Sequence, residues 1–275
     1  AAFGANTLEV GGDNTSTTFS GTLSGSGQVY KAGAGTWTLS GDNSASSAAL
    51  DVIDSGALAI ASDSNLTTGT VTLNGGTLTL TGATTVDNAI SLGIDNGTVQ
   101  ADAAATLASN ISGSGDLVKT GSATLTLSGT SAHTGDTNIQ AGTLMLTGSL
   151  AATNAVAVSA GATLAGTGTV TATSVTIASG GTLAPGNGGA GTLTLNANLG
   201  MDSGATLQAD INGTTAGSGY DQVVVNGSVT LGAGSNLPLL AVTHGYTPGL
   251  ADSYKLIDND AGDAIGNTFD SLAEG

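Results

Sequence analysis

Apolar residues alternate with small polar residues in short segments that recur along the chain. Each segment places Leu, Ile, Val or Trp on one side and mostly Thr, Ser or Ala on the other, which is the two-residue period of a half-buried strand. The segments are Thr36–Leu39, Ala57–Ile60, Thr77–Leu80, Thr98–Val99, Thr124–Leu127, Thr143–Leu146, Thr163–Ala165 and Thr182–Ala184. An apolar period of 3.6 residues is not sustained anywhere, so the pattern predicts an all-β chain without long helices.

The segments return about every twenty residues. Their central apolar residues lie 21, 20 and 21 positions apart from Trp37 to Val99 and 19, 20 and 19 apart from Leu125 to Leu183, with one interval of 26 between the series. A Gly before each segment, as in Gly75–Gly76, permits a turn with positive φ. We therefore predict a parallel β-helix, a solenoid of about 20 residues per coil with coils about 4.8 Å apart.

Side chains of one kind should stack from coil to coil in such a solenoid. Leu, Ile and Val are expected to point inward onto their counterparts, and Thr to form ladders outside. The handedness rule for parallel crossovers favours a right-handed winding. The competing layout is an up-and-down β-sandwich, which would not require a constant period.

The composition changes near residue 200. The twenty-residue rhythm covers 1–199, which we expect to be solenoid repeats, and 200–275 should form C-terminal coils and a cap within one continuous domain. Gln222–Val225 and Leu237–Val242 are continuous apolar runs. Such runs are typical of strands buried on both faces, so we expect them to close the open end of the solenoid.

A longer repeat is superimposed on the short one. Residues 25–41 match residues 113–129 without a gap, at an offset of 88, with the pattern G-S-G-x-[VL]-x-K-x-G-x-[GA]-T-x-T-L-S-G. This pattern resembles the autotransporter-associated β-strand repeat, also called the passenger-associated transport repeat. Gly181–Asn187, Tyr220–Gly227 and Thr268–Gly275 are similar to segments common late in such passengers.

The resemblance implies a right-handed parallel β-helix that a bacterium exports to its surface or beyond. It also implies a more hydrophobic C-terminal region that caps the helix and assists folding after export. The family's repeat carries no catalytic residues, so the resemblance assigns none to this chain.

Charge and composition narrow the choice of partners. The 275 residues include 45 Gly and only 8% charged residues, and 20 acidic residues against three Lys give a net charge of −17. This charge argues against nucleic acid and anionic membranes as partners. No stretch reaches the ~18 apolar residues of a membrane span, so we expect no membrane insertion. The absence of Cys excludes disulfides and thiolate sites. Ala1–Gly4 lacks the features of a signal peptide, and we expect it to be the start of a processed chain.

Paired carboxylates are the main enzymatic candidate, because β-helical polysaccharide lyases and hydrolases place acids on one outer sheet. The pairs with suitable spacing are Asp51 and Asp54, Asp42 and Asp63, and Asp116 and Asp136. Stacked carboxylates would raise one pKa, whereas Asp in turns simply accepts hydrogen bonds from backbone N–H groups. Only eight aromatic residues, one Trp, four Tyr and three Phe, could form sugar platforms. We favour the turn interpretation.

The remaining polar residues suggest weaker hypotheses. His133 and His244 lie in Gly/Thr-rich segments and are expected in surface loops. Asp258, Asp260 and Asp263 are closely spaced oxygen ligands for Ca²⁺, although the sequence lacks the Gly and Glu positions of an EF-hand. Lys31 and Lys119 share one repeat position, where each ammonium should offset nearby carboxylates or carbonyls.

Thr-x-Thr pairs raise a further alternative. They occur at Thr36/Thr38, Thr77/Thr79, Thr124/Thr126 and Thr192/Thr194. Ice-binding solenoids stack such pairs on one flat face, but Thr is also favoured on any outward strand face.

The sequence therefore predicts a non-enzymatic extracellular β-solenoid, either a rigid stalk, an adhesin or a self-assembling filament segment of a bacterial surface protein. Expected partners are a second copy bound end to end, through an uncapped first coil and the cap of another copy, or a surface glycan or protein ligand. The alternatives are a β-helical polysaccharide lyase or hydrolase and an ice-binding Thr-ladder protein.

Overall fold

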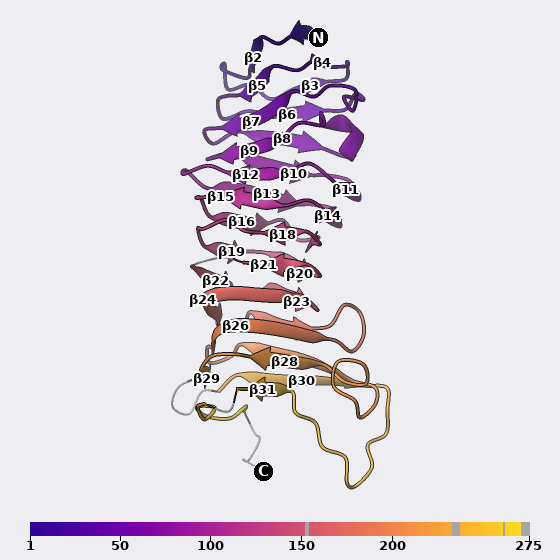
Figure 1. The fold of residues 1–275 in the computed structure, drawn as a ribbon, viewed down its shortest axis with the longest axis vertical. Coiled ribbons are helices and arrows are strands. Elements are labelled where there is room, and N and C mark those ends of the chain that lie inside the picture. Colours follow the sequence, from indigo (N-terminus) through magenta and orange to yellow (C-terminus); the bar gives the residue numbers. More distant parts are fainter. Residues whose placement is uncertain (152–153, 233–236, 261, 271–275) are drawn as a thin grey trace. The chain divides into compact units, whose positions relative to one another are not determined.

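The computed structural model describes residues 1–151, 154–232, 237–260 and 262–270. Within these ranges the regular elements are strands and one 3-10 turn, η1 (Asp63–Asn65), and no helix has the length and hydrophobicity that a membrane span requires. The chain forms two compact units, Ala1–Asp136 and Thr137–Gly275. Both are stacks of parallel β-coils, about ten turns in all (Figure 1). The prediction of a parallel β-solenoid is confirmed, and its handedness stays a prediction.

In the first unit, parallel strands build the faces of the coils. One face runs β2–β5–β7–β9–β12–β15–β18, a second runs β3–β6–β8–β10–β13–β16, and a shorter third face runs β11–β14–β17. The strands are β1 (Ala2–Gly4), β2 (Thr7–Val10), β3 (Thr17–Phe19), β4 (Ser24–Gly25), β5 (Gln28–Lys31), β6 (Thr36–Leu39), β7 (Ala49–Ile53), β8 (Ala57–Ile60), β9 (Val71–Asn74), β10 (Thr77–Leu80), β11 (Thr84–Val86), β12 (Ile90–Leu92), β13 (Gly97–Ala101), β14 (Ala105–Leu107), β15 (Ile111–Gly113), β16 (Leu117–Thr120), β17 (Thr124–Leu127) and β18 (Thr130–Ser131).

The register explains the twenty-residue period. Trp37 pairs with Leu58, Leu58 with Leu78, and Leu78 with Val99, and all four side chains are buried. Each coil therefore places an inward apolar residue on its counterpart, as the sequence predicted.

The interval of 26 between the two sequence series marks a change of face. Val99 pairs in register with Lys119 on the second face, whereas Leu125 pairs with Ala105 on the third face.

Glycines at the repeat positions allow the coils to approach closely. Gly25 and Gly113 occupy equivalent positions and have positive φ angles of 149° and 113°. A Cβ atom at Gly113 would collide with the carbonyl oxygen of Leu92 in the preceding coil, and one at Gly25 with that of Gly4. The expected role of Gly in the turns is confirmed at these positions.

In the second unit, parallel strands again build the faces. They run β19–β22–β24–β26–β29, β21–β24–β26–β28–β31 and β20–β23–β25–β27–β30. The strands are β19 (Thr137–Ile139), β20 (Gly142–Leu146), β21 (Ser149–Leu150), β22 (Ala155–Val158), β23 (Ala162–Gly166), β24 (Thr169–Ile177), β25 (Thr182–Pro185), β26 (Thr192–Met201), β27 (Thr206–Ile211), β28 (Gln222–Val225), β29 (Val229–Leu231), β30 (Leu239–His244) and β31 (Ile257–Asn259).

The coils of the second unit lengthen toward the C-terminus. On one face Thr163 pairs with Thr182, Thr182 with Thr206, and Thr206 with Leu239, so the steps grow from 19 to 24 to 33 residues. The added residues lie between strands, as in the long yellow loop between β30 and β31 in Figure 1.

The two C-terminal apolar runs have different environments. β28 is largely buried, as predicted, but β30 is largely exposed, so the expectation that Leu237–Val242 is buried on both faces is wrong. β30 pairs with β27, and among the described residues no strand covers its other edge. The proposed boundary between 1–199 and 200–275 falls inside β26, and this division stays a prediction.

Candidate functional site

The outer faces carry ladders of small polar side chains. In the second unit, one in-register ladder consists of half-buried threonines: Thr143, Thr163, Thr182 and Thr206. The neighbouring outward positions, two residues further along, hold Met145, Ala165 and Ala184. This face therefore has one column of Thr beside a column of mostly apolar residues.

The Thr-x-Thr pairs do not form a regular double array. In the first unit the Thr36/Thr38 pair stacks on Ala57/Ala59, which stacks on Thr77/Thr79, and the next coil carries Thr98/Gln100. The pair at Thr124 and Thr126 lies on the third face of that unit. These interruptions remove the continuous two-column surface on which the ice-binding alternative depends.

The two repeat lysines point into the coils. Lys31 and Lys119 are 2% and 0% exposed. The ammonium of Lys31 donates to the carbonyl oxygens of Ala32 (2.7 Å) and Gly33 (2.9 Å). Lys119 makes the equivalent bonds to Thr120 (2.7 Å) and Gly121 (2.9 Å). The predicted offset of turn carbonyls is confirmed, and each lysine closes its own turn from inside.

Burial changes the acidity of both lysines. It lowers the pKa of Lys119 to about 8, because the charged form is desolvated, while Asp102 opposes the change. Burial also lowers the pKa of Lys31, with Asp54 opposing it. These cations are therefore structural and inaccessible to a ligand.

The two histidines have different environments. His244 is exposed at the end of β30. His133 is 0% exposed, so the expectation of a surface loop is wrong for it. Burial lowers the pKa of His133, while a backbone hydrogen bond involving Asp136 and the charges of Asp116 and Asp136 oppose this change. The segment after β18 turns this side chain inward, and its Gly/Thr-rich surroundings concealed this in the sequence.

The carboxylates predicted as pairs mostly bind backbone or side-chain donors in turns. Asp116 Oδ1 accepts a hydrogen bond from the backbone N–H of Asp136, one coil away, at 2.8 Å. The other acceptors are Asp42 Oδ1 from Ser44 N (3.0 Å) and Oγ (2.6 Å), Asp51 Oδ2 from Gln28 Nε2 (2.5 Å) and Asp54 Oδ2 from Gly33 N (3.3 Å). The turn-capping interpretation is confirmed for these four residues.

Asp63 is the carboxylate nearest in character to a catalytic acid. Burial raises its pKa, and the charge of Asp87 adds to the increase. Its Oδ1 accepts a hydrogen bond from the backbone N–H of Asp87 at 3.2 Å. The sequence paired Asp63 with Asp42, because the 24-residue step to Asp87 does not follow the usual period. No aromatic platform accompanies this pair: Trp37 is buried against Phe19, with ring centroids 6.3 Å apart.

Asp221 is a buried acid that the sequence analysis did not single out. Its side chain is 3% exposed, and its two oxygens accept hydrogen bonds from the backbone N–H groups of Gly191 (2.7 Å) and Asp210 (2.9 Å). Burial raises its pKa. Asp221 thus joins the segment before β26 to β27, which gives the motif Tyr220–Gly227 a structural role.

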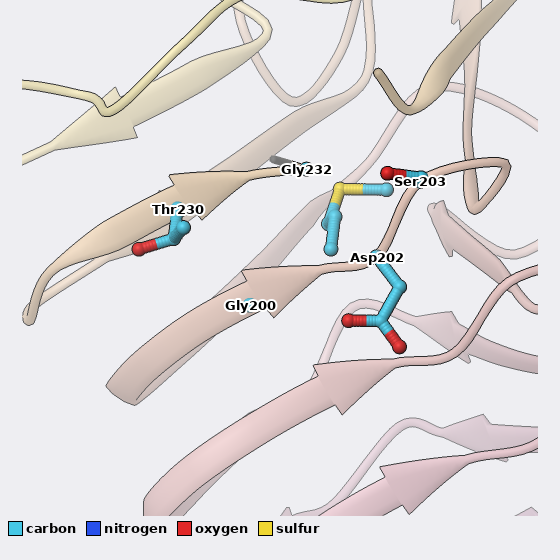
Figure 2. A pocket seen from close by; sticks show the side chains of 6 residues that line it. Gly200, Asp202, Ser203, Thr230 and Gly232 are labelled. Atoms are coloured by element: carbon cyan, nitrogen blue, oxygen red, sulfur yellow. The ribbon is translucent and has the colours of Figure 1, made fainter. Parts of the chain in front are cut away.

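An open hollow lies where β26 and β29 end. It has a volume of about 440 Å³ and is lined by Gly200, Met201, Asp202, Ser203, Thr230 and Gly232. Figure 2 shows the Asp202 carboxylate directed away from Thr230 and Gly232. The hollow therefore has no convergent set of acid, base and nucleophile among its lining residues.

The calcium candidates do not converge in the described part of the chain. Asp258 forms an ion pair with Lys255 at 3.0 Å, and the backbone N–H of Asp260 donates to Val225. No group of three or more His or acidic residues suited to a metal occurs among the described residues. The assignment of Ca²⁺ to Asp258, Asp260 and Asp263 stays a prediction.

These features define a class: a parallel β-solenoid built from repeats, with inward apolar stacks and outward small polar ladders. The sequence matches the model of the passenger-associated-transport-repeat family at residues 29–60 and 117–146. The first match spans β5 to β8, and each match contains one of the buried lysines. The chain thus carries two copies of the repeat of autotransporter passengers, and the resemblance inferred from the sequence is confirmed.

One curated relative is an autotransporter adhesin. The chain is 36% identical over 137 residues to the adhesin BmaC autotransporter of Brucella suis biovar 1 (strain 1330). The matched region is 48% of this chain and 4% of that adhesin. The chain is therefore similar to a small part of a much longer protein.

Proposed function

We propose that the chain is a non-enzymatic, surface-exposed part of a bacterial adhesin, in which the β-solenoid acts as a rigid support for ligand-binding loops and faces. The coil-on-coil register carries this proposal. Every coil is hydrogen-bonded in parallel to its neighbours within its unit, and inward residues such as Leu58 and Leu78 are fully buried. Such a ladder resists bending and needs no bound ligand to fold.

The acidic surface limits the ligands that this support could present. A net charge of −17 with three lysines, two of them buried, disfavours polyanions. A neutral glycan or a protein with a basic surface fits better. Loops are the usual carriers of binding in such scaffolds, and the long connections of the second unit are the candidate sites.

Adhesion can be tested with fluorescent beads coated with the purified chain. We expect the beads to attach to host cells, and the soluble folded chain to compete with attachment. Beads coated with the heat-unfolded chain are the control. Equal attachment of both bead types, or none on any cell or glycan surface, would contradict an adhesive role.

The non-enzymatic part needs a separate test. The chain is incubated with acidic and neutral polysaccharides, and release of new reducing or unsaturated ends is measured. We expect no release above buffer. Cleavage that disappears in Asp63→Asn but persists in Asp42→Asn would instead support the polysaccharide-cleaving alternative.

A further inference from the structure

The edge strand β30 combines exposed apolar side chains with a free sheet edge. Leu239 and Val242 are 46% and 41% exposed, and Leu250, in the following loop, is fully exposed. β30 lies beside that loop at the end of the second unit (Figure 1). Three of the four exposed large apolar residues in the described part of the chain therefore gather at β30 and its loop.

The outer edge of β30 offers backbone groups for pairing. All six residues of the strand pair in register with β27, from Leu239 opposite Thr206 to His244 opposite Ile211. On the other side, the N–H of Asp270 donates to the carbonyl oxygen of Pro238 at 2.8 Å. From Leu240 onward the outward-directed backbone groups have no partner among the described residues. Unpaired edges of this kind are templates for another strand.

The inward positions of β30 show that a covering strand is missing there. The residues below them on β27, Leu207 and Ala209, are buried, whereas Leu240 is half-buried and Val242 exposed. One additional strand would complete the burial that every earlier coil on this face achieves. An added strand must therefore place apolar residues over Leu240 and Val242.

A second copy of β30 meets this requirement. The strand contains no acidic residue, so two copies can approach here although each chain carries a charge of −17. An antiparallel pairing centred on Ala241 places Leu240 of one copy opposite Val242 of the other, both on the inward side. This pairing is isologous, because each copy contributes the same surface.

The first coil is a poorer partner. After β3, residues 20–23 form no strand, and the third face of the first unit begins only at β11. The end-to-end association expected from the sequence, with the first coil of one copy on the last coil of another, would thus leave β30 without a strand to pair with.

We propose that two copies of the chain associate through antiparallel pairing of their β30 strands, tail to tail, with Ala241 at the two-fold axis. This association is independent of the adhesive function proposed above. Because both copies are acidic, the dimer should strengthen as salt screens their repulsion.

Sedimentation velocity of the full chain at several concentrations and at two salt concentrations tests this proposal. We expect a concentration-dependent dimer for the native chain. Ala241→Lys should raise the dissociation constant at least about tenfold, because the two introduced charges lie opposite each other, and so should Ala241→Glu. An equimolar mixture of the two variants should recover the dimer. Gln208→Lys, on the exposed side of β27 directly below Ala241, is the matched control and should dimerise normally.

Cysteine cross-linking provides the second measurement, since the chain contains no Cys. Oxidised Ala241→Cys should give a covalent dimer, and Gln208→Cys should give little. A monomer at all concentrations, a dimer insensitive to both Ala241 substitutions, filaments in place of dimers, or equal cross-linking at the two positions would overturn the proposal.

Discussion

The buried ammonium of Lys119 should make the stability of the solenoid depend on pH in the alkaline range. The pKa of Lys119 is about 8 in the folded chain, against an ordinary value of 10.5. Between these two pH values, the unfolded chain binds a proton that the folded chain has released. The free energy of unfolding therefore rises with pH in this interval, and below pH 8 this contribution is constant.

The magnitude follows from the two pKa values. At pH 9.5 the folded lysine is mostly neutral and the unfolded one mostly charged, which corresponds to at most about 2 kcal/mol of added stability relative to pH 7. Burial lowers the pKa of Lys31 as well, so it acts in the same direction. A neutral amine can still donate hydrogen bonds to the Thr120 and Gly121 carbonyls, so deprotonation does not abandon the turn.

Urea unfolding followed by circular dichroism at pH 7.0 and 9.5 measures this effect. Lys119→Met should lose most of the alkaline gain, whatever its stability at pH 7. Lys255→Met removes an exposed lysine that pairs with Asp258 and should retain the gain. If the native chain and Lys119→Met gained equally between the two pH values, the argument from burial would be wrong.

Three further predictions concern other buried groups. Burial lowers the pKa of His133, so the native chain should lose up to about 1 kcal/mol between pH 7.0 and 5.5, and urea unfolding of His133→Gln should show a smaller loss than His244→Gln. Leu164 is fully buried, and Leu164→Ala should cost about 2–5 kcal/mol, against less than about 1 kcal/mol for the outward-facing Thr163→Ala, also in urea. Asp221→Asn replaces one of two acceptors by a donor facing an N–H group and should cost about 1–3 kcal/mol in thermal unfolding. A Leu164→Ala variant as stable as Thr163→Ala, or an unchanged melting temperature for Asp221→Asn, would contradict these assignments.

The coil architecture could be predicted from the sequence because parallel stacking imposes a nearly constant period. A strand that places Leu78 on Leu58 must repeat at 20 or 21 positions, and this spacing is visible without coordinates. The inward direction of Lys31 was also encoded. It lies two residues after the buried Val29, so strand alternation places both on one side, although a lysine is ordinarily expected outside.

Other features depend on tertiary context that no local pattern records. His133 is buried because its segment turns inward after β18, and its neighbours in sequence do not reveal that turn. Similarly, an apolar run such as that in β30 indicates burial only when a further strand follows on the same face. The pairing of Asp63 with Asp87 escaped detection because it uses a step of 24 residues.

The lengthening of the coils in the second unit has a functional consequence. On one face the step grows from 19 residues between Thr163 and Thr182 to 33 between Thr206 and Leu239, yet the paired residues remain in register. The insertions therefore cost the ladder nothing, since they lie in connections, and the entropic cost of longer connections grows only slowly with length. A solenoid of this kind can vary its loops while its strands keep one spacing. Differences in binding among proteins built on this repeat should accordingly arise in the connections and at the terminal edge, while the stacked core stays the same.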